Sequence, residues 1–178
     1  ISIFKTTGND NIFLATRNGM AICFNENDAR AVGRTASGVK AIDLADGDYV
    51  VGAEPVREDS KVLLVTDGGY GKCTDLTSFR IQHRGGKGLK AYKITEKTGN
   101  IIGISMVNDS EELIMVTSEG VVIRIRIKDI ATTTGRITQG VRLINLEKRN
   151  DEIASVCKVL SESVDENLQD DNVTEVAE

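Results

Sequence analysis

Apolar and polar positions alternate along the chain in a pattern that repeats three times. Each unit opens with an apolar, β-prone run that ends in a glycine-containing tight turn, and a second β-prone run follows directly. The first runs span residues 12–16, 62–66 and 113–117, and the second runs span residues 20–24, 70–74 and 121–125. Two such runs joined by a tight turn predict a β-hairpin in each unit.

The remainder of each unit also follows a fixed order. A polar, basic stretch of about 14 residues follows each hairpin, and because it is too long for a turn we expect it to hold a helical turn and a loop. A third strand is expected at residues 39–44, 89–94 and 141–146. After a short turn, a fourth strand is expected at residues 49–56, 100–107 and 152–159.

Two recurring markers set the period of the units. Gly19, Gly69 and Gly120 occupy the same place in the three hairpins, at spacings of 50 and 51 residues. The second marker, Arg-x-x-x-Gly followed by an apolar and a basic residue, spans 34–40, 84–90 and 136–142. Four strands in about 50 residues is the size of a propeller blade. We therefore predict an all-β, propeller-like fold with four-stranded blades.

The repeats fill most of the chain, but they are too few to form a complete circular array. They span about 12–56, 62–107 and 113–159, and residues 1–5 stand where the last strand of a preceding repeat would lie. Repeat units bury their faces against neighbours, so about three and a half repeats predict part of a longer array. Because the chain does not begin with Met, we expect an internal segment of a longer protein.

Charge is distributed unevenly along the chain. The formal net charge of −5 argues against a polyanionic partner, but residues 161–178 hold seven acids and no base, which leaves residues 1–160 at +2. The acidic segment is polar and predicts a disordered tail, either a solubilising terminus or an internal competitor for a basic surface. The first repeat has a net charge of −2, the second +4 and the third +3.

The recurring basic residues fall at equivalent places around the long loop, so a radial array would put them along one rim. Regularly spaced Arg and Lys residues suit contacts with a phosphate backbone, although many such residues are simply solvated. No Trp is present, and we expect six of the seven Phe and Tyr residues, all but Phe79, to lie in or beside strands. Base stacking on single strands is therefore poorly supported, and a bent duplex remains possible.

The second repeat contains the segment Gln82-His83-Arg84-Gly85-Gly86-Lys87-Gly88. Its three glycines let the backbone approach a partner closely and supply amide donors beside two cations, as in an anion-binding turn, or they form a flexible loop. The candidate DNA-binding residues are Arg34, Lys40, Arg80, Gln82, Arg84, Gly85, Gly86, Lys87, Gly88, Lys90, Arg136 and Arg142.

Six of those seven positions match the box Gln-basic-Arg-Gly-Gly-Lys-Gly of the bacterial DNA gyrase A subunit, with His83 in place of the usual Arg or Lys. Residues 15–19 and 140–144 also resemble the C-terminal domain of that protein. The resemblance covers residues 1–160 and implies a partial β-pinwheel, usually six-bladed, whose basic rim wraps duplex DNA and permits negative supercoiling. Because the defining box lies in the first blade of the family, residues 82–88 could be a later, degenerate copy.

The resemblance also implies a setting for the domain. The parent would be a cytoplasmic, ATP- and Mg²⁺-dependent topoisomerase, with the cleaving Tyr outside this chain. The partners would be the gyrase B subunit together with the remainder of the A subunit. This segment itself is expected to be non-catalytic, to need no cofactor or metal and to have no membrane contact. The odd number of cysteines, three, fits a reducing compartment, and the apolar runs are too short for a membrane-spanning helix.

Other functions and sites fit the sequence less well. The equivalent domain of topoisomerase IV and a protein-interaction propeller remain alternatives, and a propeller hydrolase would need acidic or metal clusters that these rims lack. Residues 67–74 resemble a nucleotide-binding P-loop, but Thr66 replaces its first Gly, Cys73 replaces its Ser or Thr and the context is a hairpin. Cys23 and Cys73 are expected to be small strand residues, and a zinc site or a Ser-His-Asp triad at His83 is not supported.

Overall fold

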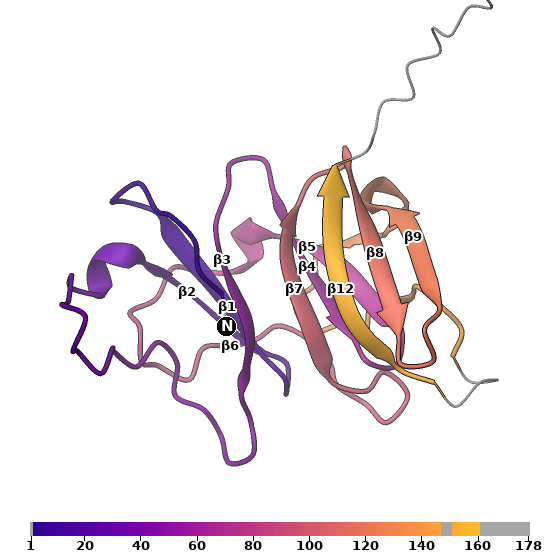
Figure 1. Cartoon of the computed structure of the whole chain (residues 1–178), viewed down its shortest axis with the longest axis horizontal. Coiled ribbons are helices and arrows are strands. Elements are labelled where there is room, and N and C mark those ends of the chain that lie inside the picture. Colours follow the sequence, from indigo (N-terminus) through magenta and orange to yellow (C-terminus); the bar gives the residue numbers. More distant parts are fainter. Residues whose placement is uncertain (1, 147–150, 161–178) are drawn as a thin grey trace, which may run out of the picture.

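A computed structural model of the chain describes residues 2–146 and 151–160 (Figure 1). Within these ranges the regular structure consists of β-strands and three short 3-10 helices, which confirms the all-β fold. No helix among the described residues is long and apolar enough to cross a membrane. The predicted acidic tail, residues 161–178, lies outside the described residues.

Each repeat is built on a hairpin and one further antiparallel strand, the fourth strand of the predicted unit. The hairpins are β1 (Asn11–Thr16) with β2 (Met20–Asn25), β4 (Lys61–Thr66) with β5 (Tyr70–Asp75), and β8 (Glu111–Thr117) with β9 (Val122–Arg126). The predicted fourth strands are β3 (Val50–Pro55), β7 (Ile101–Val107) and β12 (Ile153–Leu160). Each of these pairs antiparallel with the first strand of its own hairpin. The predicted hairpins and fourth strands are thus confirmed.

The expected helical turn follows each hairpin. It is the 3-10 helix η1 (Glu26–Asp28), η2 (Leu76–Ser78) or η3 (Ile127–Asp129). Residues 2–5 form no strand in the structure; their assignment to a preceding repeat stays a prediction.

The third strand of each unit differs from the prediction. Residues 39–44 form no strand, and the later copies are reduced to β6 (Leu89–Lys90) and β11 (Val141–Arg142). Moreover, β6 pairs with β2 of the preceding repeat, and β11 pairs with β5 of the preceding repeat. A further short strand, β10 (Thr132–Thr133), runs parallel to β5. The outer part of each of the first two sheets is therefore supplied by the next repeat, so strands are exchanged between these blades.

This exchange buries residues of one repeat in the core of another. The core cluster that contains Phe13 of the first repeat also contains Ala91 and Tyr92 from just after β6. Phe79 belongs to the same cluster and packs edge-on against Phe13, with 4.8 Å between the ring centroids. Phe79, the aromatic residue that the sequence left outside the strands, is therefore a core residue, whereas Tyr49 is 54% exposed.

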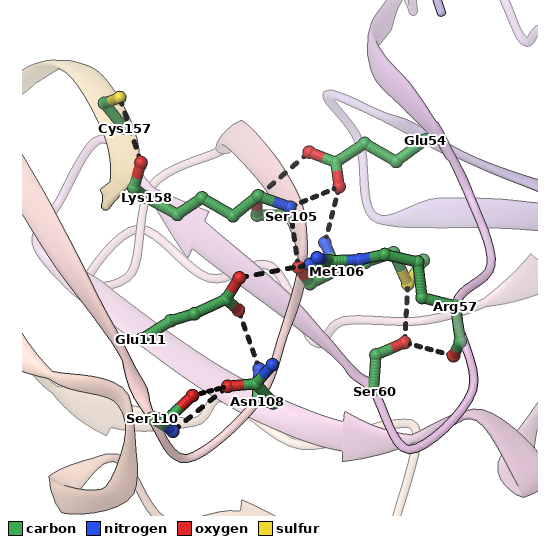
Figure 2. Close-up of polar contacts among 10 residues, drawn as sticks. All are labelled: Glu54, Arg57, Ser60, Ser105, Met106, Asn108, Ser110, Glu111, Cys157 and Lys158. Atoms are coloured by element: carbon green, nitrogen blue, oxygen red, sulfur yellow. Dashed lines mark hydrogen bonds and ion pairs between the residues drawn. The ribbon is translucent and has the colours of Figure 1, made fainter. Parts of the chain in front are cut away.

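The fourth strands of the three repeats, β3, β7 and β12, are called the inner strands here. They lie beside one another in successive blades (Figure 1). Figure 2 shows the polar contacts that join them. Lys158 of β12 donates through Nζ to Glu54 Oε2 of β3 at 3.0 Å and to the Met106 carbonyl of β7 at 2.8 Å. The other oxygen of Glu54 accepts from Ser105 Oγ at 3.0 Å. A carboxylate and an ammonium thus join three blades at this edge, away from the exchanged strands.

Candidate nucleic-acid interface

The marker glycine permits each exchange. Gly88 and Gly140 have φ values of +73° and +69°, which favour glycine. A Cβ atom would lie 2.4 Å from the Ala21 carbonyl oxygen at Gly88 and 2.3 Å from the Gly71 carbonyl oxygen at Gly140. The marker therefore crosses directly over the second hairpin strand of the preceding repeat, and its glycine is needed for that close approach.

The box segment, residues 82–88, lies along the first repeat rather than its own. The backbone N–H of Gln82 donates to the Cys23 carbonyl at 2.7 Å, and that of Gly85 donates to the Ala41 carbonyl at 2.7 Å. In return, the Asp43 N–H donates to the Gly86 carbonyl at 2.9 Å. These contacts use two backbone amide donors of the box, whose sequence left an anion-binding turn and a flexible loop as alternatives. The loop is held by contacts within the protein.

Two of the predicted site arginines are engaged within the protein. Arg84 Nε donates to the Asp28 carbonyl at 2.8 Å, and its Nη1 donates to the Lys40 carbonyl at 3.0 Å. Arg136 Nη1 donates to the Lys90 carbonyl at 3.3 Å. Both side chains are half-buried. Gln82 is also half-buried, and its Nε2 atom has no hydrogen-bond partner among the described residues.

The remaining predicted bases are exposed. They are Arg34, Lys40, Arg80, Lys87, Lys90 and Arg142. Lys40 forms a 2.9 Å ion pair with Asp43. The hydrogen bond and the charge of Lys40, with a smaller contribution from the charge of Lys87, lower the pKa of the Asp43 carboxyl. Arg142 stacks over the Tyr70 ring, 5.8 Å from its centroid. Lys40, Lys90 and Arg142 end the three markers, so the structure presents an exposed base at the same place in each repeat.

Within the described ranges, no hydrogen bond or ion pair engages the ammonium groups of Lys87 and Lys90. A hollow of about 420 Å³ beside Lys87 is lined by apolar residues of the first repeat together with three carboxylates, those of Asp43, Asp46 and Asp48. Such an acidic hollow repels phosphate, so any polyanion contact here uses the projecting lysines rather than a pocket.

Lys72 was missed by the sequence analysis because it stands within a β-prone run. It lies on β5 at the place that Ile22 occupies in β2, and it is fully buried. Its ammonium donates to the Arg136 carbonyl, to the Gly135 carbonyl at 3.3 Å and to Thr138 Oγ1 at 3.2 Å. Burial, together with the charge of Arg136, lowers the pKa of Lys72 to about 8. A buried cation thus holds the loop that carries Arg136.

The other residues considered in the sequence have structural roles. Cys23 and Cys73 are buried strand residues, and burial raises the pKa of each thiol to about 11. This confirms the expectation of small strand residues. His83 is exposed, and its Nδ1 lies 3.1 Å from Asp28 Oδ2.

Comparisons with known proteins agree with this geometry. The family model described as DNA gyrase C-terminal domain, beta-propeller, matches residues 10–57, 60–108 and 111–157. The DNA gyrase A subunit of Ureaplasma parvum is 46% identical over 155 residues, which cover 87% of this chain and 18% of the relative. The DNA gyrase A subunit of Staphylococcus aureus is 42% identical over 176 residues, which cover 98% of this chain and 20% of the relative. The chain thus spans about a fifth of the length of the curated relatives it matches.

Two solved structures have the same fold. The crystal structure of the C-terminal domain of DNA topoisomerase IV superposes with a TM-score of 0.83 at 28% identity, covering 89% of this chain and 49% of that one. The DNA gyrase A C-terminal domain superposes with a TM-score of 0.79 at 26% identity, covering 89% of this chain and 52% of that one. Three family matches in register with the three repeats, together with these superpositions, show that the chain belongs to the DNA gyrase C-terminal domain family of β-propellers.

Proposed function

We propose that this chain binds and wraps duplex DNA as the C-terminal module of a DNA gyrase A subunit, and that it supports ATP-dependent negative supercoiling by the holoenzyme. The observation that carries the proposal is the exposed base that ends each marker, Lys40, Lys90 and Arg142. One such residue per blade gives a row of cations along successive blades. A row of cations neutralises a phosphate backbone and releases its counterions.

The chemistry of the surface favours backbone contact over base recognition. Tyr49 and Phe4 are the exposed aromatic residues among the described ranges, and both lie outside the markers. Without aromatic platforms beside the lysines, stacking of single-stranded bases has little support. We therefore propose duplex binding with little sequence preference, dominated by phosphate contacts.

The parent protein supplies the remaining functions in this proposal. The rest of the A subunit would hold the cleaving tyrosine, the B subunit would be the further partner, and ATP and Mg²⁺ would act outside this chain. The free cysteines Cys23, Cys73 and Cys157 are consistent with a cytoplasmic location.

A second candidate is the equivalent domain of topoisomerase IV, supported by the superposition at a TM-score of 0.83. The relatives at 46% and 42% identity are gyrase A subunits, which favours gyrase. A holoenzyme that supercoils relaxed circular DNA would support the gyrase assignment. One that only relaxes or decatenates DNA would support topoisomerase IV.

Binding to duplex DNA is expected to weaken steeply with salt. If about four phosphates are neutralised by the exposed marker bases, the slope of log K against log salt should be about −4. Fluorescence anisotropy with a labelled duplex, repeated from 50 to about 200 mM salt, measures this slope for the full chain. A single strand of the same length is the control and should compete less well. Salt-insensitive binding, or no binding, would contradict the proposed function.

A further inference from the structure

The marker arginines make the same contact at both junctions between repeats. Arg84 donates to the Lys40 carbonyl at 3.0 Å, and Arg136 donates to the Lys90 carbonyl at 3.3 Å. In each case the donor is the first residue of one marker and the acceptor is the last residue of the marker before it. The contact therefore links consecutive markers and recurs with the repeat.

A backbone hydrogen bond accompanies the arginine at each junction. The Asp43 N–H donates to the Gly86 carbonyl at 2.9 Å, and the Lys93 N–H donates to the Thr138 carbonyl at 3.1 Å. These two pairs are equivalent, since acceptor and donor each stand at the same distance from their marker glycine and marker base. The second side-chain contact of Arg84, to the Asp28 carbonyl at 2.8 Å, adds η1 to the same junction.

Guanidinium chemistry explains why this position holds arginine. The planar guanidinium group of arginine has five N–H donors and can bond two carbonyl oxygens at once. A lysine ammonium is a compact point charge at the end of a flexible side chain. Two of the Arg84 nitrogens already donate to carbonyls of the first repeat. The Nε–H group, which a side-on bidentate contact with a phosphate would use, is therefore already engaged within the protein.

Lys87 follows Arg84 in the same loop. It is flanked by Gly85, Gly86 and Gly88, whose backbones have unusual freedom, so an unanchored segment would place its ammonium poorly. The bonds of Arg84 hold the beginning of the segment on the preceding repeat. The Lys87 side chain, in contrast, is exposed.

We propose that Arg84 and Arg136 are positioning residues for DNA binding: each fixes its own basic loop onto the marker of the preceding repeat and so aligns the exposed bases of neighbouring blades. The proposal rests on the proposed function, because it assigns the phosphate contacts to Lys87 and to the bases that end the markers, Lys40, Lys90 and Arg142. The arginine charge contributes little, and its hydrogen-bonding geometry contributes most.

A double-mutant cycle of Arg84→Lys and Lys87→Gln tests this in the full chain. Arg84→Lys keeps the charge, yet we expect it to weaken duplex binding about tenfold and to reduce the salt slope by about 1, as if a phosphate contact were lost. Lys87→Gln should weaken binding by about five- to tenfold at an unchanged melting temperature. In the double variant the Lys87 change should add less than about twofold, because Lys87 is already misplaced.

Each other outcome overturns the proposal. Wild-type affinity and slope in Arg84→Lys would show that charge alone matters there. A lower melting temperature with fully additive effects on binding would show a merely structural residue. Absence of duplex binding by the wild type would overturn the proposed function as well, which distinguishes the two failures. Arg136→Lys with Lys90→Gln tests the second junction, where the lysine is the base of the preceding marker, as Lys40 is at the first junction.

Arg57→Lys is the matched control. Arg57 also donates to a backbone carbonyl, that of Met106, and lies 3.4 Å from Glu111 Oε1 at the edge where the inner strands meet (Figure 2). The control is expected to lower the melting temperature as much as Arg84→Lys does, while the DNA affinity and the salt slope stay within about twofold of the wild type. A loss of DNA binding in this control equal to that in Arg84→Lys would overturn the positioning role.

Discussion

Duplex binding is expected to fall by at least about 100-fold when Lys87 and Lys90 are both replaced by glutamate. Both side chains are exposed, and no hydrogen bond or ion pair within the described residues engages their ammonium groups. Two reversals change the local charge by four units, replacing counterion release by repulsion of the duplex. Because neither ammonium supports the fold, the melting temperature should stay within about 2 °C of the wild type, as is usual for surface substitutions.

The control for this prediction changes the net charge equally at lysines outside the markers. Lys5 and Lys128 are exposed, and their replacement by glutamate should weaken binding less than about threefold. Anisotropy titrations at one fixed salt concentration compare the two double variants. An equal loss in both would mean that overall charge, and not the marker row, determines binding; no loss in either would contradict phosphate contact by these blades.

The period of the repeat made most of the fold predictable. Apolar runs ending at Gly19, Gly69 and Gly120 identify three hairpins because tight-turn chemistry is local in sequence. The fourth strands follow for the same reason. In contrast, residues 89–94 look like a strand of their own blade, yet only Leu89 and Lys90 pair, and they pair with β2. The strand that pairs with β2 is determined by contacts between residues far apart in the sequence, which the local pattern does not contain.

The sequence identified which basic residues belong to the candidate site, but it predicted only part of what each residue does. Basic positions recur visibly, so the exposed row of Lys40, Lys90 and Arg142 follows from the spacing. The sequence could not separate Arg84 from Lys87, because a carbonyl acceptor such as that of Lys40 leaves no trace in the sequence pattern. Their assignment as DNA-binding residues stays a prediction.

Lys72 is the residue whose role sequence reasoning missed most completely. A lysine in a strand that otherwise follows the apolar pattern is normally read as a solvated side chain. The signal that could have found it is its equivalence to Ile22 of the first repeat, a core position. A buried cation at a core position needs acceptors, and the loop at Gly135 and Arg136 supplies them.

Replacement of Lys72 by methionine is expected to destabilise the protein by about 3 kcal/mol at neutral pH, since it leaves the Gly135 and Arg136 carbonyl groups without their donor. The loop that carries Arg136 should lose protection from hydrogen exchange at the same time. Urea unfolding measures the first effect. The matched control is Ile22→Met, which puts the same side chain at the equivalent place in the first repeat and should cost less than about 1.5 kcal/mol. Equal costs for the two variants would contradict a bonding role for Lys72.

The pH dependence of stability provides an independent test of the same group. Burial lowers the pKa of Lys72 to about 8 in the folded protein, from its ordinary value of 10.5. Between these values the unfolded chain binds the proton and the folded protein does not, so the free energy of unfolding rises with pH across this window. The methionine variant lacks the titrating group, so the stability of the wild type relative to Lys72→Met should increase from pH 8 to about 10. A difference that stays constant with pH would mean that the ammonium has the same pKa in both states, which would contradict its burial from solvent.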